Sequence, residues 1–183
     1  MSNPCERCYL SLRHQRTAGR GVGCTHTTRA SIMFIDDIAT ISDYKQNDIF
    51  VGRSTKILNK FIDDYKLSHW SYKTHLIKCV CQEAHTDYAD KCFAYLIDEI
   101  HKVQPKIIIT IGSFVYRYLK DENTRNMKNV VNKLTTFNNS ILIPIYSPSY
   151  IIRNGCYDEY VKSFTLISDV FADICREYNW VKP

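Results

Sequence analysis

The sequence predicts an α/β domain of three layers, an α/β/α arrangement with a central, mostly parallel sheet of four strands. The first observation is four short apolar runs rich in β-branched residues: SIMFID from Ser31, THLIKCV from Thr74, KIIITIG from Lys106 and SILIPIY from Ser140. The second is that stretches of helical period separate these runs. Continuous apolar strands that alternate with helices are typical of a parallel sheet covered on both faces.

The helices are predicted from apolar residues that recur every three or four positions. Such patterns cover residues 57–65, 92–103, 114–119 and about 158–177. Between residues 15 and 30 the chain is rich in glycine, threonine and arginine without any period, so we expect a loop there.

The composition is that of a globular chain. Its 183 residues suit a single domain over residues 1–183, with a cysteine-containing amino-terminal segment. Hydrophobic residues make up 45% and charged residues 23%, and no run approaches the roughly 18 apolar residues of a membrane span. We therefore expect no membrane partner. No apolar signal region opens the sequence, which favours an intracellular protein, in the cytoplasm or at a nuclear or viral site of replication.

The net charge of +5 suits a partner made of phosphates, although an ordinary basic surface gives the same value. Isoleucine, lysine, asparagine and tyrosine are abundant, which is typical of AT-rich genomes such as those of some viruses and phages. In parallel sheets, ligands bind beyond the carboxyl ends of the strands. That rule selects four places: Asp36-Asp37, Lys78-Cys79, Gly112-Ser113 and Ser147-Pro148.

Eight cysteines in an intracellular protein are better candidates for metal ligands or buried residues than for disulfides. Cys5 and Cys8 form a CxxC pair, whose thiolates can reach one metal from a tight turn. A second pair could come from Cys79, Cys81 or Cys92. Spacing does not separate a four-thiolate zinc site from a four-iron cluster.

Seven segments in order resemble the iron-sulfur (type-4-like) uracil-DNA glycosylases of the uracil-DNA glycosylase superfamily. They are CERC, IMFIDD, IFVGRSTKIL, THLIKC, DKCFAYL, QPKIIITIG and SPSYIIRN. The resemblance covers Cys5 to about Asp169 and implies a structural 4Fe-4S cluster held by Cys5, Cys8, Cys79 and Cys92, with Cys81 as a bystander.

The resemblance also implies a base pocket, and here the sequence departs from the family. Where the family has Gly-Glu-Ala-Pro-Gly this chain has Asp36 to Thr40, so Asp37 stands at the glutamate position while the bare glycine backbone is lost. Phe50 matches the aromatic residue that stacks on the flipped base. His75 replaces the asparagine that reads uracil, so we expect either a different base edge or no base at all to be read there.

The last motif carries Ser147 where the family has the histidine that stabilises the departing base. Ser147 suits a helix N-cap, Pro148 the first helical position and Gly155 the helix end. The resemblance places DNA contacts on this helix, with backbone amides and an arginine for phosphates and an apolar wedge for the opened stack. These residues are Ser149, Tyr150, Ile151 and Arg153.

Two functions follow from these motifs. The first is a DNA glycosylase that excises uracil or a modified pyrimidine, with Asp37 or Asp36 serving the sugar and its water and Ser147 as a weak donor to the base. The second is a glycosylase fold without hydrolysis that binds DNA or docks on a replication protein. The expected partner is DNA, through its backbone and a flipped base, with a replication protein as a further partner under the second function.

Overall fold

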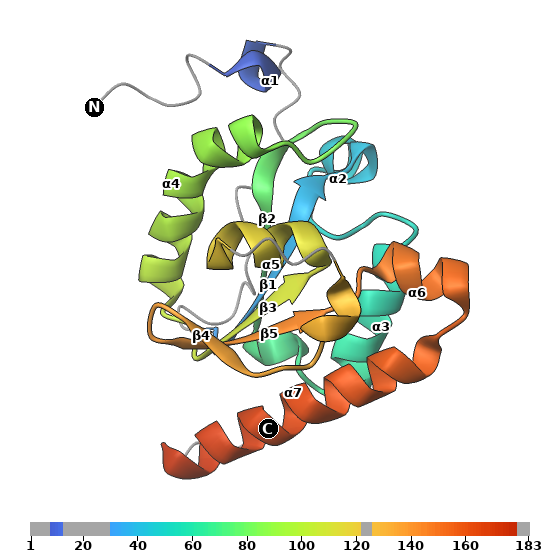
Figure 1. Ribbon diagram of the computed structural model, residues 1–183, viewed down its shortest axis with the longest axis vertical. Helices are drawn as coiled ribbons and strands as arrows, with labels where there is room; N and C mark the ends of the chain where they lie inside the picture. Colours follow the sequence, from blue (N-terminus) through green and yellow to red (C-terminus); the bar gives the residue numbers. More distant parts are fainter. Residues whose placement is uncertain (1–7, 13–29, 122–125, 179–183) are drawn as a thin grey trace.

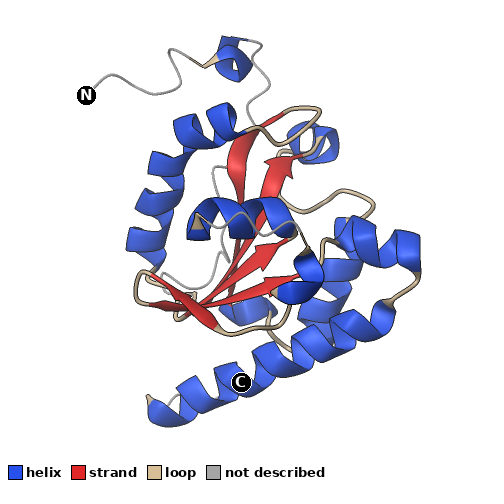
Figure 2. Ribbon diagram, viewed as in Figure 1, coloured by secondary structure: helices blue, strands red, loops and turns tan. Residues whose placement is uncertain are grey.

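The computed structural model describes residues 8–12, 30–121 and 126–178. Within them, five strands form one sheet in the order β2-β1-β3-β5-β4 (Figures 1 and 2). The strands are β1 Ile32–Ala39, β2 Ser71–Val80, β3 Ile107–Ile111, β4 Thr135–Phe137 and β5 Ser140–Ile145.

The α-helices are α1 Tyr9–Leu12, α2 Ile41–Gln46, α3 Thr55–Asp64, α4 Thr86–Val103, α5 Ser113–Lys120, α6 Pro148–Asn154 and α7 Tyr157–Glu177. Two 3-10 turns, η2 Ser68–Trp70 and η3 Met127–Asn129, precede β2 and β4. In the described part of the chain, no helix is both long and apolar enough to cross a membrane.

The predicted α/β class and its four parallel strands are confirmed, but the sheet has a fifth strand. β1 pairs in parallel with β2 and β3, and β3 pairs in parallel with β5. The additional strand, β4, is an antiparallel edge strand joined to β5 by a tight turn, with Phe137 opposite Ser140. Asn138 in this turn has a φ of 51°. The Asn138-Asn139 pair is the sequence signal for this hairpin, because asparagine tolerates positive φ.

The sheet separates two apolar layers, as expected for a strand buried on both faces. Ile32 and Phe34 of β1 face a cluster built with α3, α6 and α7. Met33 and Ile35 face the other cluster, built with α1, α4 and α5. The alternation within β1 therefore fixes which helices cover which face.

The long helices lie where the helical periods predicted them, with α4 beginning earlier than expected. The sequence reading missed α2, which begins directly after β1. Its N-cap is Thr40, whose side chain accepts from the Asp43 amide while the Asp43 carboxylate accepts from the Thr40 amide. This reciprocal arrangement is a capping box. Thr40, which stands where the family has a glycine, is therefore the N-cap of a helix.

Parallel pairing brings the predicted site residues to one edge. Asp36 lies opposite His75 across the β1–β2 ladder. Ile111 lies opposite Ile145, so Gly112 and the residues before Ser147 leave the sheet side by side. Because neighbouring strands are about 4.8 Å apart, the ends of β1 and β5 are separated by about 10 Å. One nucleoside spans such a distance.

Candidate active site at the carboxyl edge of the sheet

The paired acids lie at the end of β1, next to an irregularity in the ladder between Ile38 and Ala39. They belong to the strand rather than to a loop after it, and both are half-buried. Asp36 Oδ1 accepts from the Asp37 amide at 2.9 Å, and Asp37 Oδ1 accepts from the Ile38 amide at 2.8 Å. These bonds hold two carboxyl groups close together at the sheet edge.

The two acids do not share the same affinity for protons. Burial, and then the charge of Asp37, raise the pKa of Asp36 well above its usual range. Burial also raises the pKa of Asp37, but the Ile38 amide and the nearby His75 oppose that rise. The pair therefore takes up its first proton on Asp36, while Asp37 stays ionised. This gives one neutral acid and one carboxylate at the same place.

Phe50 and His75, the two residues expected to bind a base, contact each other. Their ring centroids are 5.1 Å apart, with the rings inclined by 60°. Phe50 is 0% exposed and His75 is 2% exposed. Among the described residues, neither ring nitrogen of His75 has a hydrogen-bond partner. Two unsatisfied buried nitrogens are unusual, because buried polar groups are normally paired.

Asp43, which the sequence reading did not select, holds this region together. Its side chain is 1% exposed. Oδ1 accepts from the Val51 amide at 2.9 Å, and Oδ2 accepts from the Thr40 amide at 2.8 Å and the Thr40 hydroxyl at 2.6 Å. Oδ2 also lies 3.5 Å from His75 Nε2. The Thr40-x-x-Asp43 spacing was the signal that could have identified it.

The backbone at Phe50 adopts a conformation that is rare for an aromatic residue. Its φ is 59°, in the left-handed region. The Phe50 carbonyl accepts from Asn59 Nδ2 at 2.9 Å, and Asn59 Oδ1 accepts from Lys73 Nζ at 2.7 Å. With the Asp43–Val51 bond on its other side, this residue is fixed from two directions. Such conformations persist only where their surroundings determine them.

Ser147 caps α6 as its sequence predicted. Its Oγ accepts from the Tyr150 amide at 3.3 Å, Pro148 occupies the first turn, and Gly155 ends the helix at a φ of 62°. Gly112 stands next to the cap, since a Cβ built on it would lie 3.6 Å from Ser147 Cβ. The Ser147 hydroxyl is half-buried, and its own proton stays available for donation.

The predicted DNA contacts on α6 divide into exposed and buried residues. Ser149 and Arg153 are exposed, and Arg153 Nε donates to the Ser149 carbonyl. Tyr150 is half-buried and stacks on Tyr146 with ring centroids 4.5 Å apart. Ile151 is 0% exposed, so in this structure its side chain belongs to the core.

The amides of α6 are partly used within the chain. The Tyr150 amide bonds the Ser147 carbonyl and hydroxyl, and the Ile151 amide bonds the Ser147 carbonyl. Ile152, with 44% of its surface exposed, is the aliphatic side chain that this helix offers to solvent. The basic loop before β1 lies outside the described residues.

Three of the four predicted cluster ligands share one buried environment. Cys8, Cys79 and Cys92 all belong to the apolar cluster under α1, α4 and α5, while Cys5 lies outside the described residues. Among the described residues, no group of three or more side chains is placed to hold a metal ion. Burial, with smaller effects of Asp37 and Cys92, raises the pKa of the Cys81 thiol to about 11.

Lys78, beside Cys79, is bound inside the fold. Its Nζ donates to Glu99 Oε2 and to Thr74 Oγ1, each at 2.6 Å, and Thr74 Oγ1 donates to the same Glu99 oxygen at 2.7 Å. Lys78 and Glu99 side chains are 6% and 11% exposed. This triad ties β2 to α4 and leaves Lys78 no role at a DNA surface.

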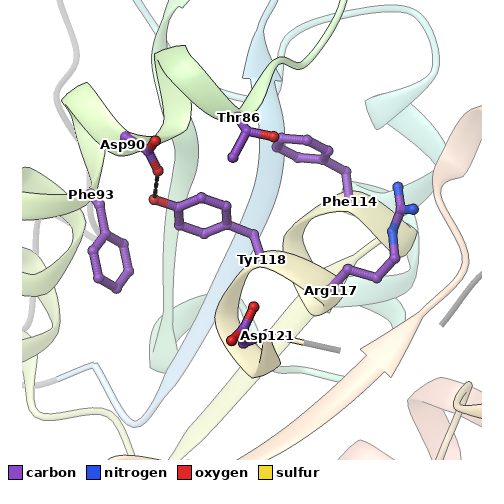
Figure 3. Close-up of a pocket in the computed structure, with 7 residues that line it drawn as sticks. All are labelled: Thr86, Asp90, Phe93, Phe114, Arg117, Tyr118 and Asp121. Atoms are coloured by element: carbon purple, nitrogen blue, oxygen red, sulfur yellow. Dashed lines mark hydrogen bonds between the residues drawn. The ribbon is translucent and has the colours of Figure 1, made fainter. Parts of the chain in front are cut away.

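A separate hollow of about 600 Å³ lies between α4 and α5 (Figure 3). Its walls include the rings of Phe93, Phe114 and Tyr118, and the Tyr118 hydroxyl donates to Asp90 at 2.7 Å. None of the predicted catalytic or base-binding residues lines it. The sequence reading did not anticipate this hollow, since its residues come from two helices without a shared motif.

Comparison with known proteins shows the family to which the chain belongs. A sequence model of the uracil-DNA glycosylase superfamily matches residues 27–171, which include β1 and most of α7. The chain is 28% identical over 163 residues to the type-4 uracil-DNA glycosylase of Saccharolobus solfataricus, an alignment of 82% of this chain and 73% of that protein. It is 25% identical over 163 residues to the type-4 uracil-DNA glycosylase of Sulfurisphaera tokodaii, covering 82% and 72%. The chain therefore belongs to the uracil-DNA glycosylase superfamily.

Proposed function

We propose that this protein is a DNA glycosylase that releases uracil or a modified pyrimidine by hydrolysing the N-glycosidic bond of an extruded nucleotide. The observation that carries the proposal is the arrangement at the carboxyl edge of the sheet: a pair of acids, the Phe50–His75 contact and the Ser147 cap. The two relatives are uracil-DNA glycosylases by name, which supports it. If its substrate is DNA, we expect the protein to be found where the genome is replicated or stored.

The acids divide the work at the sugar. As the bond to the base breaks, positive charge develops on the sugar and a water molecule must attack it. Asp37, the member of the pair that stays ionised, balances that charge and accepts a proton from the water. Asp36 holds a proton more tightly than Asp37, because burial and then the charge of Asp37 raise its pKa, so a proton on Asp36 limits repulsion within the pair.

Ser147 serves the leaving base. Negative charge develops on the base during cleavage, and a donor aimed at that charge lowers the barrier. The Tyr150 amide occupies an acceptor site of Ser147 Oγ, which directs the hydroxyl and leaves its proton for the base. A hydroxyl supplies one hydrogen bond but no positive charge. We therefore expect slower release than a histidine at this position would allow.

The DNA backbone is bound by the exposed side of α6. Ser149 and Arg153 reach solvent there and suit phosphate contacts, while Tyr150 and Ile152 border the same surface as apolar groups for the opened stack. Ile151 supports this surface from beneath, since it packs in the core. Basic residues between Arg13 and Arg29 complete the expected contacts.

We infer that Cys5, Cys8, Cys79 and Cys92 hold a 4Fe-4S cluster. The shared burial of Cys8, Cys79 and Cys92 supports this set. Cys81 stands outside this set, since it is only half-buried and packs against the border of the cluster that holds the other three thiols. When bound, the cluster supplies a cross-link between the amino terminus and the sheet. The burial of Cys8, Cys79 and Cys92 already brings the residue before α1, the end of β2 and α4 into one apolar cluster.

The cluster is tested by colour and metal content. Purified protein should be brown with roughly four irons per chain, as a four-cysteine cluster requires. Cys81→Ser should keep the colour, whereas Cys92→Ser should lose it. A colourless protein with stoichiometric zinc would contradict the cluster and leave the fold unchanged.

Base release is tested with purified protein and oligonucleotides, single-stranded or duplex, that contain uracil or a modified pyrimidine. Alkali-labile abasic sites should appear for at least one base. Asp37→Asn should lower the rate by about a hundredfold or more, because an amide neither accepts the proton nor balances the cation. Asp87→Asn is the matched control, since that side chain is 84% exposed and outside the site. Equal rates for both variants would contradict the role of Asp37.

One observation favours a second function, a glycosylase fold that binds DNA or a replication protein without hydrolysis. Phe50 and His75 are shielded from solvent, so the base site is closed in this structure. DNA binding without release of any base would support this alternative. It would also agree with the altered residues at three motifs.

A further inference from the structure

We infer that Asp43 is a positioning residue that fixes His75 in the tautomer protonated on Nε2, so that Nδ1 accepts the N3–H of a uracil- or thymine-type base. This inference rests on the proposed function and deepens it by naming the group on the base that is read. It concerns a residue outside the predicted site and a contact between the residues of α2 and β2.

First, the His75 imidazole is buried without a hydrogen-bond partner in the described part of the chain. His75 is 2% exposed, and among the described residues neither of its ring nitrogens has a partner. A buried donor or acceptor left in this state costs free energy that most folds avoid. The ring meets Phe50 with centroids 5.1 Å apart, so it borders the residue proposed to stack on the base. An unpaired polar group at that point suits a ligand better than it suits the core.

The second step is the carboxylate beside one of the two nitrogens. Asp43 Oδ2 lies 3.5 Å from Nε2. Burial alone would raise the pKa of Asp43, but hydrogen bonds from Thr40 and Val51 and the neighbouring His75 lower it to about 2, so the group is ionised. An ionised carboxylate only accepts hydrogen bonds, and it therefore favours the proton on the nearer nitrogen.

The third step is the state of the ring. Burial lowers the pKa of His75, against the opposing effect of Asp43, so the imidazole is neutral. A neutral imidazole with its proton on Nε2 has its lone pair on Nδ1. The charged groups that also act on the ring are Lys78 and Asp37, and Lys78 is held by Glu99.

The consequence is selection by a single ring proton. Uracil and thymine carry a hydrogen on N3, which can be donated to Nδ1. Cytosine carries a lone pair on N3, which would face the Nδ1 lone pair and leave both groups unpaired. An asparagine side-chain amide can contact both a donor and an acceptor of the base, whereas Nδ1 of His75 can only accept from a donor of the base. The site therefore takes pyrimidines that carry an imide N–H, as uracil and thymine do.

The tautomer is tested by ¹⁵N NMR of the imidazole nitrogens at neutral pH. The chain has six histidines, so the His75 signals are identified by their loss in His75→Asn. We expect Nε2 to carry the proton and Nδ1 to be unprotonated. Asp43→Asn should abolish this preference, because its amide can donate as well as accept. Thr40→Val is the matched control: it removes the two hydrogen bonds of the Thr40 hydroxyl, one to Asp43 Oδ2 and one from the Asp43 amide, but keeps the carboxylate, and the tautomer should not change.

The reading of N3 is tested with oligonucleotides that contain deoxyuridine, N3-methyldeoxyuridine or deoxycytidine at one position. Wild-type protein should bind or cleave the deoxyuridine site about tenfold or more better than the other two, and His75→Ala should lose that difference. Equal treatment of uracil and N3-methyluracil by the wild type would overturn the reading of N3. A wild-type ring protonated on Nδ1 would overturn the role of Asp43. No base release from any oligonucleotide, with the expected tautomer, would contradict the proposed function instead.

Discussion

Two segments border the candidate site, and they are stabilised in different ways. The segment from Asp36 to Gly52 is held by half-buried side-chain hydrogen bonds between residues three to nine positions apart. The Asp43 carboxylate accepts from the Thr40 and Val51 amides, and Asn59 Nδ2 donates to the Phe50 carbonyl. The helix α6 is held by its own caps, Ser147 and Gly155. Changes in the first segment should therefore cost stability, whereas changes on α6 should alter function and leave the fold intact.

The largest expected effect comes from removing the centre of the first segment. Asp43→Ala leaves the buried amides of Thr40 and Val51 without an acceptor. We expect the free energy of unfolding, from urea titration, to fall by about 3 kcal/mol. Asp48→Ala, an exposed acid in the same segment, is the control and should cost well under 1 kcal/mol. Similar losses for both variants would remove the contrast between the two segments.

The same carboxylate predicts a pH dependence. Burial opposes ionisation, but hydrogen bonds and His75 bring the pKa of Asp43 from 3.8 to about 2 in the folded protein. The unfolded chain therefore binds this proton first, so the stability that Asp43 contributes is present above about pH 4 and is lost as the pH falls towards 2. The difference in unfolding free energy between wild type and Asp43→Asn should shrink by about 2 kcal/mol over that interval.

His75 also makes the free energy of unfolding fall as the pH falls, but at a higher pH than Asp43 does. Burial lowers its pKa in the folded state, so its contribution to stability is lost as the pH falls below about 6.5. Asp36 acts in the opposite direction, because its raised pKa favours the folded state in acid. Comparison of variants at each pH separates these groups. A wild-type minus Asp43→Asn difference that is constant from pH 5 to pH 2 would contradict the lowered pKa of Asp43 in the folded protein.

A smaller effect is expected at the end of α6. Gly155 has a φ of 62°, and, apart from its chain neighbours, no atom of the described residues lies within 4 Å of a Cβ built on it. Gly155→Ala should therefore cost about 1 kcal/mol through backbone strain alone. Gly155→Asn should cost less, because asparagine tolerates this conformation better. Equal unfolding free energies for the glycine and alanine forms would show that α6 ends differently in solution.

The smallest effect on the fold belongs to Arg153. This side chain is exposed on α6, and its contact is with the Ser149 carbonyl of the same helix. Arg153→Gln should leave the unfolding free energy nearly unchanged and lower the salt dependence of DNA binding by about one phosphate contact. Lys60→Gln, whose partner is Asp64 on α3, is the matched control. An unchanged slope for Arg153→Gln would remove this helix from the DNA interface.

Structural features that depend on neighbouring residues in the sequence could be predicted, whereas those that depend on contacts made by the fold could not. Caps such as Ser147 and Gly155 act within a few residues, so α6 was predicted correctly, as were four strands with continuous apolar runs. The short edge strand β4 was missed because three residues show no pattern. Asp43 was missed because two of its four contacts, Val51 and His75, are set by the fold rather than by neighbouring residues. The closed Phe50–His75 contact was not predictable for the same reason.

The central claim is that the carboxyl edge of the sheet breaks an N-glycosidic bond, with Ser147 as the weak element. Its most direct test is the single-turnover rate of uracil release from single-stranded DNA by wild type, Ser147→His and Asp37→Asn. We expect release by the wild type, release faster by about tenfold or more with Ser147→His, and loss of release with Asp37→Asn, at nearly equal DNA affinity. No uracil release by either the wild type or Ser147→His, with both folded and bound to DNA, would contradict the claim.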